Sequence, residues 1–81
     1  MKVHLYKTQY CSKCPAAMKY LNNKRVDFEV IDCTNDIKEL SPASDVSGVY
    51  TVPQIKIGRD VIVGLDYGKL AIALRKHGLM E

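Results

Sequence analysis

Two cysteines separated by two residues, Cys11 and Cys14, are the side chains of this sequence best suited to covalent chemistry. They follow a short predicted strand and open a helix that is expected to begin at Cys11 or Ser12. The free N–H groups and the positive dipole end of a helix favour an anion, which lowers the pKa of the first thiol. Lys13 adds positive potential. Cys14, about one helical turn further on, can attack a mixed disulfide formed by Cys11. The spacing therefore predicts a redox-active dithiol.

Two other roles for these cysteines stay open. A structural zinc site takes four ligands, commonly from two such cysteine pairs. Cys33, His4 and His77 are the candidates for the remaining ligands, but they lie on different predicted elements and the sequence has no second pair. The two cysteines could also be inert core residues. We favour the dithiol, and we expect no metal and no tightly bound cofactor.

The elements that must position the dithiol can be predicted from hydrophobic periodicity. Alternation of apolar residues indicates strands, and helical spacing of apolar residues indicates helices. Strands are expected over residues 3–7, 26–31, 53–57 and 61–63. Helices are expected over residues 11–23 and 67–77, with a weaker helical region over 37–47 that Pro42 interrupts. Thr34 or Asn35 is the expected cap of this weaker region, and glycines at positions 48 and 78 are expected to end helices.

The order of these elements predicts an α/β fold of the form β-α-β-α-β-β-α. The first helix joins two strands over the length of a βαβ unit, so those two strands should be parallel. The last two strands, joined by a turn at Gly58-Arg59-Asp60, should form an antiparallel hairpin. The result is a mixed four-stranded sheet with helices packed on it.

Length and composition predict one domain over residues 1–81. The chain is 47% hydrophobic and 26% charged, so disorder is not expected. It is too short for a doubly wound nucleotide-binding domain or a barrel. A net charge of +3 with scattered basic residues argues against nucleic-acid binding. No signal peptide is recognised, and no stretch approaches the roughly 20 apolar residues that cross a bilayer. We therefore expect a cytoplasmic monomer with no membrane partner.

Three motifs, in order and in register, resemble the glutaredoxins of the thioredoxin superfamily. They are Cys11-Ser12-Lys13-Cys14, then Thr51-Val52-Pro53, which is similar to the family's T-V-P, and Gly64-Leu65-Asp66, which is similar to its G-x-D turn. The resemblance spans almost the whole chain and implies a thioredoxin-like fold. It also implies a thiol–disulfide oxidoreductase that reduces protein disulfides or glutathione mixed disulfides.

The resemblance implies a role for each motif. Cys11 would be the nucleophile and Cys14 the resolving thiol. Pro53 would be cis, and the backbone of Val52 would pair with a bound thiol peptide as an added strand does. The turn before the last helix would hold the γ-glutamyl end of glutathione through its Asp66 carboxylate.

Neighbouring residues complete the expected site. The backbone of Leu65 would share the glutathione contact with the following aspartate. Thr51 and Tyr10 are further candidates: the Thr51 hydroxyl for contact with a ligand, and Tyr10 for shielding the thiolate and contacting substrate. Their alternatives are an ordinary strand-edge residue and a partly exposed aromatic residue. Asp66 has a second interpretation, as the cap of the last helix. Cys33 is expected to be a small buried hydrophobic residue rather than a reactive thiol.

The sequence departs from the glutaredoxin pattern at Thr8. Glutaredoxins usually have Lys or Arg at this position, where it meets the glycyl carboxylate of glutathione. A related group of small redoxins supplies electrons to ribonucleotide reductase and is reduced by thioredoxin reductase, so that donor stays open beside glutathione. Ser12 also keeps open an iron–sulfur module, in which Cys11 and a small thiol would bind a cluster at a dimer interface.

Overall fold

The computed structural model describes residues 3–79. Within this range the strands and helices follow in the predicted order. They are β1 (Val3–Lys7), α1 (Cys14–Asn23), β2 (Phe28–Asp32), the 3-10 helix η1 (Ile37–Leu40), α2 (Ser41–Ser47), β3 (Gln54–Ile57), β4 (Asp60–Val63) and α3 (Tyr67–Lys76). None of the helices in the described range is both long enough and apolar enough to cross a membrane.

The strands form one mixed sheet in the order β2-β1-β3-β4. β1 pairs with β2 in parallel, from Val3 opposite Phe28 to Lys7 opposite Asp32. β3 is antiparallel to both β1 and β4. The predicted sheet is therefore confirmed. This arrangement brings the ends of β1, β2 and β4 to the same edge of the sheet as the start of β3.

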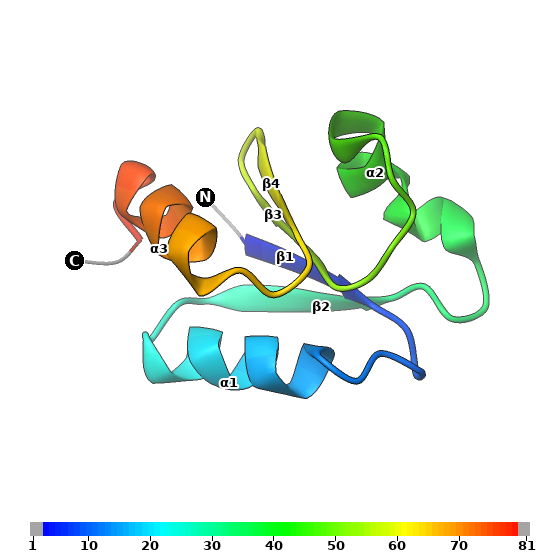
Figure 1. Cartoon of the computed structure of the whole chain (residues 1–81), viewed down its shortest axis with the longest axis horizontal. Helices are drawn as coiled ribbons and strands as arrows, with labels where there is room; N and C mark the ends of the chain where they lie inside the picture. The colour runs from blue at the N-terminus through cyan, green and yellow to red at the C-terminus, as the bar shows by residue number, and fades with distance from the viewer. Residues whose placement is uncertain (1–2, 80–81) are drawn as a thin grey trace.

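Helices cover both faces of the sheet, as Figure 1 shows. α1 and α3 share a core with the strands on one face, and each leucine fully buried there contributes about 1.5–3 kcal/mol. That core consists of Val3, Leu5, Ala17, Leu21, Val26, Ile55, Ile57, Ile62, Leu70, Ala73 and Leu74. A smaller core lies under η1 and α2 on the other face, made of Tyr6, Cys33, Leu40 and Ala43. The helix that follows the cysteines is thus fixed against the sheet.

Two strands begin later than predicted. β2 starts at Phe28 because the residues before it still belong to the turn that ends α1. Arg25 has a positive φ of 58°, and the Val26 N–H donates to the Leu21 carbonyl at 3.0 Å. β3 starts one residue after Pro53, which has no N–H to donate to a neighbouring strand.

The middle helical region differs from the prediction in its cap and its proline. Asp36, not Thr34 or Asn35, caps η1, since its side chain accepts the Lys38 N–H at 3.0 Å. Pro42 does not interrupt a helix but lies in the first turn of α2, where its missing N–H costs nothing. The predicted glycine stops are confirmed at position 48, with φ of 80°, and at position 78, with φ of 70°.

Candidate active site

Cys11 and Cys14 are joined in a disulfide, with their Cα atoms 5.6 Å apart. Cys14 is buried, with 2% of its surface exposed, whereas Cys11 is only half-buried. A disulfide of another molecule therefore reaches the Cys11 sulfur more readily than the Cys14 sulfur. The structure places the predicted pair together, with unequal access to its two members.

The start of α1 differs from the prediction of a helix that begins at Cys11 or Ser12. The first helical residue is Cys14. The Cys11 N–H donates to the Thr8 carbonyl at 3.1 Å, which closes a turn instead of extending the helix. The nucleophile candidate thus lies in the loop before the helix and not in its first turn.

The N-terminal end of α1 has no side-chain cap. Lys13 is the N-cap residue, and its side chain makes no capping hydrogen bond. Pro15 lies in the first turn, as predicted. The first intrahelical bond from this cap runs from the Ala17 N–H to the Lys13 carbonyl at 3.1 Å. The N–H groups before Ala17 are therefore open to an acceptor such as a thiolate in the preceding loop.

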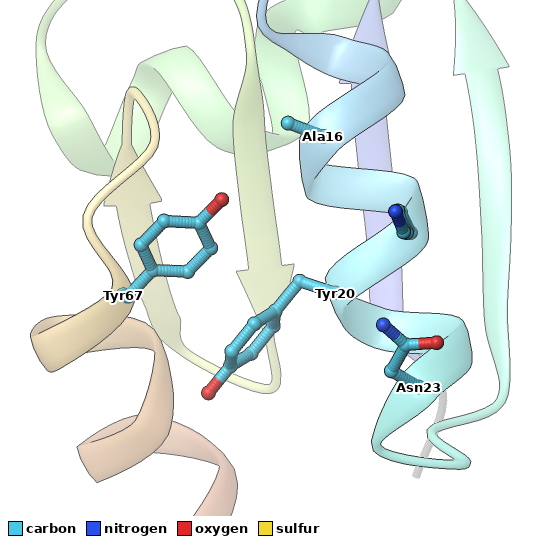
Figure 2. Close-up of a pocket in the computed structure, with 5 residues that line it drawn as sticks. Ala16, Tyr20, Asn23 and Tyr67 are labelled. Carbon is cyan, nitrogen blue, oxygen red and sulfur yellow. The ribbon is translucent and has the colours of Figure 1, made fainter.

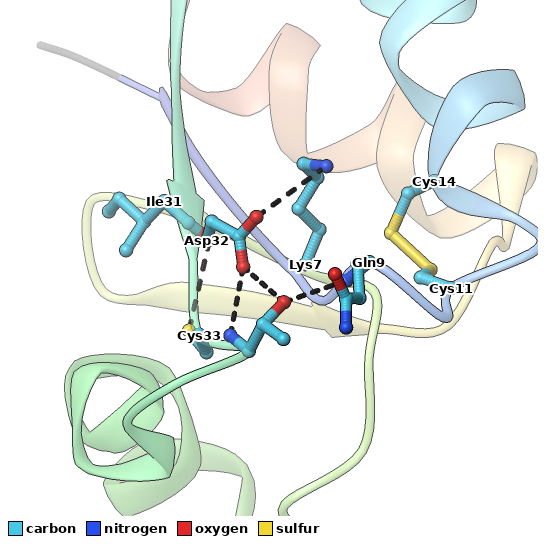
Figure 3. Close-up of polar contacts among 8 residues, drawn as sticks. Lys7, Gln9, Cys11, Cys14, Ile31, Asp32 and Cys33 are labelled. Atoms are coloured by element: carbon cyan, nitrogen blue, oxygen red, sulfur yellow. Dashed lines mark hydrogen bonds and ion pairs between the residues drawn. A yellow bond between two sulfur atoms is a disulfide. The ribbon is translucent and has the colours of Figure 1, made fainter.

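Hydrogen bonds tie the turn before Cys11 to the end of β2, as Figure 3 shows. The Gln9 N–H donates to the Thr34 hydroxyl oxygen at 2.8 Å. The Thr34 hydroxyl and N–H both donate to Oδ1 of Asp32, the N–H at 2.8 Å. Sequence reasoning missed this connection, although an Asp that accepts the amide two residues later is a common turn signal.

Hydrogen bonds and a nearby cation favour the ionised form of Asp32, whereas burial and nearby carboxylates favour the protonated form of Cys33. Hydrogen bonds from Thr34, and then the Lys7 ammonium 3.9 Å away, hold the pKa of Asp32 below its usual value. Burial, and then the nearby carboxylates of Glu39, Asp32 and Asp36, raise the pKa of Cys33. Cys33 is buried, as predicted, and its burial and raised pKa both disfavour the reactive thiolate form.

The Thr51-Val52-Pro53 motif lies at the same edge of the sheet as the cysteine loop. Tyr6 is opposite Gln54 in the β1–β3 register, so the residues before Gln54 lie beside those that follow β1. The Val52–Pro53 peptide bond is cis, as the resemblance implied. Within residues 3–79, the Val52 backbone makes no hydrogen bond. Thr51 is exposed and Val52 half-buried.

Gln54 holds the loop that leads to this motif. Its side chain is fully buried, and its Nε2 donates to the carbonyls of Val49 at 2.9 Å and Thr51 at 2.8 Å. Its Oε1 accepts from the Ser47 hydroxyl at 2.8 Å. All the polar atoms of this amide are thus used to fix residues 47–51. Sequence reasoning treated Gln54 only as a strand residue and missed this role.

The Gly64-Leu65-Asp66 turn joins the same edge. The Gly64 N–H donates to the Pro53 carbonyl at 2.8 Å, and Gly64 has a positive φ of 75°. The Asp66 side chain accepts the Lys69 N–H at 3.1 Å, so the capping interpretation is confirmed. Leu65 is half-buried against the larger core and Asp66 is exposed. The three predicted motifs therefore meet at one end of the sheet.

The two remaining predicted site residues are at the surface. Tyr10, next to Cys11, is 84% exposed, and Lys13 is also exposed. Both are free to meet a molecule that approaches the disulfide.

A cavity of about 420 Å³ lies between α1 and α3, and Figure 2 shows the side chains around it. Ala16, Lys19, Tyr20 and Asn23 line it from α1, and Tyr67 lines it from the first turn of α3. The Tyr20 and Tyr67 rings are tilted, with centroids 5.0 Å apart. The sequence analysis did not identify this cavity. One of its lining residues, Tyr67, directly follows Asp66 in the sequence.

The side chains considered for zinc do not gather around the cysteine pair. Nowhere in residues 3–79 do three or more His, Cys, Asp or Glu side chains come together in a way that could hold a metal ion. His77 instead contacts Asp60 at 2.8 Å, and His4 lies 3.7 Å from Glu29.

Comparison with known proteins points to one family. The Glutaredoxin family model matches residues 3–62. A glutaredoxin from Pseudomonas aeruginosa is 36% identical over 64 residues, which cover 79% of this chain and 76% of that protein. An uncharacterized glutaredoxin-like 8.6 kDa protein from the rubredoxin operon of Clostridium pasteurianum is 28% identical over 74 residues, which cover 91% of this chain and 99% of that protein.

A solved structure agrees with these sequence matches. The crystal structure of the glutaredoxin grx-1 from Archaeoglobus fulgidus superimposes with a TM-score of 0.76 and 28% sequence identity. The superposition covers 90% of this chain and 85% of that one. The predicted thioredoxin-like fold is therefore confirmed.

Proposed function

Because this chain belongs to the glutaredoxin family, we propose that it is a thiol–disulfide oxidoreductase that reduces protein disulfides and mixed disulfides with glutathione. The observation that carries the proposal is the Cys11–Cys14 disulfide, with its more accessible sulfur ahead of an uncapped helix start. The two thiols supply both electrons, so the reaction needs no bound cofactor. It needs a supply of reduced thiols, which the cytoplasm provides.

In the proposed reaction, the Cys11 thiolate attacks first because its sulfur is the accessible one. It bonds to one sulfur of the substrate disulfide, and the other sulfur leaves as a thiolate that takes up a proton. Cys14 then gives up its proton, attacks the Cys11 sulfur and releases the second substrate thiol. The substrate gains two electrons, and the two cysteines lose two as their disulfide forms again.

Glutathione is the small thiol that we propose as co-substrate. The Val52 backbone is available to pair with the peptide, since it makes no hydrogen bond within the described residues. Oδ1 of Asp66 accepts the Lys69 N–H, which leaves its other oxygen and its charge for the α-ammonium of the γ-glutamyl group. Val52 and Asp66 both lie at the edge of the sheet that carries the disulfide.

Thioredoxin reductase is the second candidate electron donor. Lys7 and Thr8, which precede the cysteines, support it, because neither offers a free cation to glutathione. The position expected to meet the glycyl carboxylate of glutathione is Thr8, which has no charge. The adjacent Lys7 does not replace that charge, because its ammonium lies 3.9 Å from the Asp32 carboxylate. A glutathione carboxylate would lack its usual partner here.

The donor can be identified from NADPH oxidation in two matched assays. One contains glutathione, glutathione reductase and a glutathionylated peptide, and the other contains thioredoxin reductase and insulin. Insulin reduction driven by dithiothreitol shows independently that the dithiol works. Turnover only with thioredoxin reductase would overturn the glutathione proposal. No turnover in either coupled assay, together with no insulin reduction by dithiothreitol, would overturn the oxidoreductase proposal.

Variants of the two cysteines test their separate roles. Cys11→Ser should abolish all reductase activity, because the attacking sulfur is gone. Cys14→Ser should stop reduction of protein disulfides but spare removal of glutathione, which can proceed through one thiol. Undiminished reduction of insulin by Cys14→Ser would contradict the resolving role.

A further inference from the structure

Cys11 lies at the end of a turn that side-chain packing does little to fix. Its N–H donates to the Thr8 carbonyl at 3.1 Å, which leaves Gln9 and Tyr10 at the tip of the turn. Both tip residues are exposed. Segments with few buried contacts open easily, so the position of this turn depends on its hydrogen bonds to other elements.

One such bond reaches the tip from a residue 25 positions away. The Gln9 N–H donates to the Thr34 hydroxyl oxygen at 2.8 Å. Because a backbone N–H can only donate, the hydroxyl must be the acceptor and must direct its own hydrogen elsewhere. That hydrogen goes to Oδ1 of Asp32. The direction of both hydrogen bonds is thus fixed, and a hydroxyl is required at position 34.

The base of this connection is anchored in the sheet. Asp32 is the last residue of β2 and lies opposite Lys7 in the parallel register. The Cys33 N–H donates to the Lys7 carbonyl at 2.7 Å, and the Thr34 N–H donates to Oδ1 of Asp32 at 2.8 Å. Figure 3 shows the path from this strand end to the loop that carries Cys11. The bond to Gln9 therefore connects an exposed turn to a strand end that is paired in the sheet.

We propose that Asp32 and Thr34 are positioning residues that hold the turn before Cys11. They thereby fix the position of the Cys11 sulfur relative to the start of α1. The proposal rests on the proposed function in that Cys11 is the attacking thiol there. Neither residue touches the reacting sulfur. They act through the Gln9 backbone, two residues before it.

The consequence of this arrangement is chemical. The uncapped N–H groups at the start of α1 stabilise a thiolate only if the sulfur is held near them. If the turn moves freely, the sulfur spends less time there, and the thiolate form is less favoured. The pH at which Cys11 becomes reactive should then rise.

The test compares Thr34→Val with Thr34→Ser in the reduced protein. Valine keeps the shape of threonine but removes the hydroxyl, whereas serine keeps the hydroxyl. The rate of Cys11 alkylation by iodoacetamide is measured against pH, with the modified peptide identified by mass spectrometry. Thr34→Val should move the midpoint of this profile upward, and its rate at about pH 6 should fall about threefold or more, as a rise of half a pKa unit requires. Thr34→Ser should keep the parent profile.

Asp32→Asn separates hydrogen bonding from charge. The asparagine oxygen still accepts from Thr34, but the negative charge is gone. A positioning role predicts that the midpoint for Cys11 in Asp32→Asn does not rise above that of the parent. Removal of a negative charge near the thiolate would by itself lower this midpoint. A clear rise in this variant would therefore mean that the hydrogen bond kept by asparagine does not hold the turn, and it would overturn the proposal.

Hydrogen exchange tests the same connection without any substitution. In the reduced protein, the Gln9 amide should exchange more slowly than the Tyr10 amide, which donates no hydrogen bond within the described range. Equal exchange rates would overturn the proposal, even if Thr34→Val does not fold. An unchanged profile in folded Thr34→Val would overturn it too, as would equal shifts in the valine and serine variants.

These readouts are independent of the substrate. Cys11 alkylation and Gln9 exchange can be measured whether or not the protein accepts glutathione. If the parent protein reduces neither insulin nor the glutathionylated peptide while Thr34→Val still shifts the profile, the proposed function fails and the positioning role stands. If insulin is reduced and the profile does not shift, the positioning role fails alone.

Discussion

The Pro53 carbonyl accepts a hydrogen bond from the Gly64 N–H at 2.8 Å, and this bond joins two motifs that are separate in the sequence. It sets the cis Val52–Pro53 bond beside the turn that leads to Asp66. A peptide paired with the Val52 backbone, as proposed, would lie at the edge of the sheet where Asp66 caps α3. The proposed glutathione site depends on both contacts, and the charged one can be removed alone.

Asp66→Asn should weaken the use of a glutathionylated peptide relative to the reduction of insulin. The asparagine oxygen can still accept the Lys69 N–H, so the helix cap is kept. The charge that would face the α-ammonium is lost, and a hydrogen bond to a charged group contributes about 1.5–3 kcal/mol. We therefore expect KM for the glutathionylated peptide to rise about tenfold or more. Equal KM values in the coupled NADPH assay would leave Asp66 as a helix cap only.

The three cysteines should differ in reactivity when the protein is reduced. Cys11 precedes the start of α1 and is the more accessible sulfur, so iodoacetamide at about pH 6 should modify it first. Cys14 is buried, and burial followed by nearby carboxylates raises the pKa of Cys33. Peptide mass spectrometry after short exposure gives the order. Cys11→Ser is the control and should stay unmodified, whereas equal labelling of all three cysteines would contradict the premise.

Gln54→Leu should destabilise the protein because it removes the three hydrogen bonds by which the Gln54 side chain holds residues 47–51. The carbonyls of Val49 and Thr51 and the hydroxyl of Ser47 would lose this partner. Leaving such groups unsatisfied costs about 1–3 kcal/mol each when they are buried, so we expect a loss of about 2–4 kcal/mol in the free energy of unfolding. Urea unfolding of the oxidised protein measures it. Ser47→Ala removes only one of the Gln54 bonds, along with two longer contacts to Val49 at 3.4 Å, and should cost less. A Gln54→Leu variant as stable as the parent would contradict the role.

Local rules explain the parts of the fold that could be predicted from the sequence. Alternation and helical spacing act over a few residues, and they predicted the order of the elements. The glycine stops at positions 48 and 78 were predictable because a left-handed residue favours glycine wherever it occurs. The site motifs were identifiable because each is contiguous, and the shared edge of the sheet then brings them together.

The missed features depend on contacts between distant residues. The bond from Gln9 to Thr34 spans 25 positions, and no local pattern of either residue predicts it. Gln54 points to the polar face of its strand by alternation, yet α2 covers that end of the sheet and buries it. Val30, which alternates with Phe28 along the strand, is 39% exposed because β2 is an edge strand. The burial and contacts of these residues depend on the assembled sheet and on the helices packed against it.

Asp60 and His77 join the β3–β4 hairpin to the end of α3, and their contact should make the stability of the fold depend on pH. His77 Nε2 lies 2.8 Å from Oδ2 of Asp60, and the Lys76 ammonium lies 3.3 Å from the same oxygen. The hydrogen bonds from His77 and then Lys76 lower the pKa of Asp60 below its ordinary value of 3.8. A carboxyl whose pKa is lower in the folded state stabilises the protein fully above its unfolded pKa. This contribution is lost as the pH falls through the folded value.

Asp60→Asn should therefore flatten the dependence of stability on pH in the acid range. Between about pH 5 and about pH 3, the urea midpoint of the parent should fall more steeply than that of the variant, because only the parent has this carboxylate to protonate. Asp45→Asn is the matched control, since Asp45 is an exposed residue of α2 that forms no ion pair within residues 3–79. Its stability should follow the slope of the parent. Parallel slopes for the parent and Asp60→Asn would show that the contact with His77 does not stabilise the fold, because an ion pair that does so must be lost when its carboxylate is protonated.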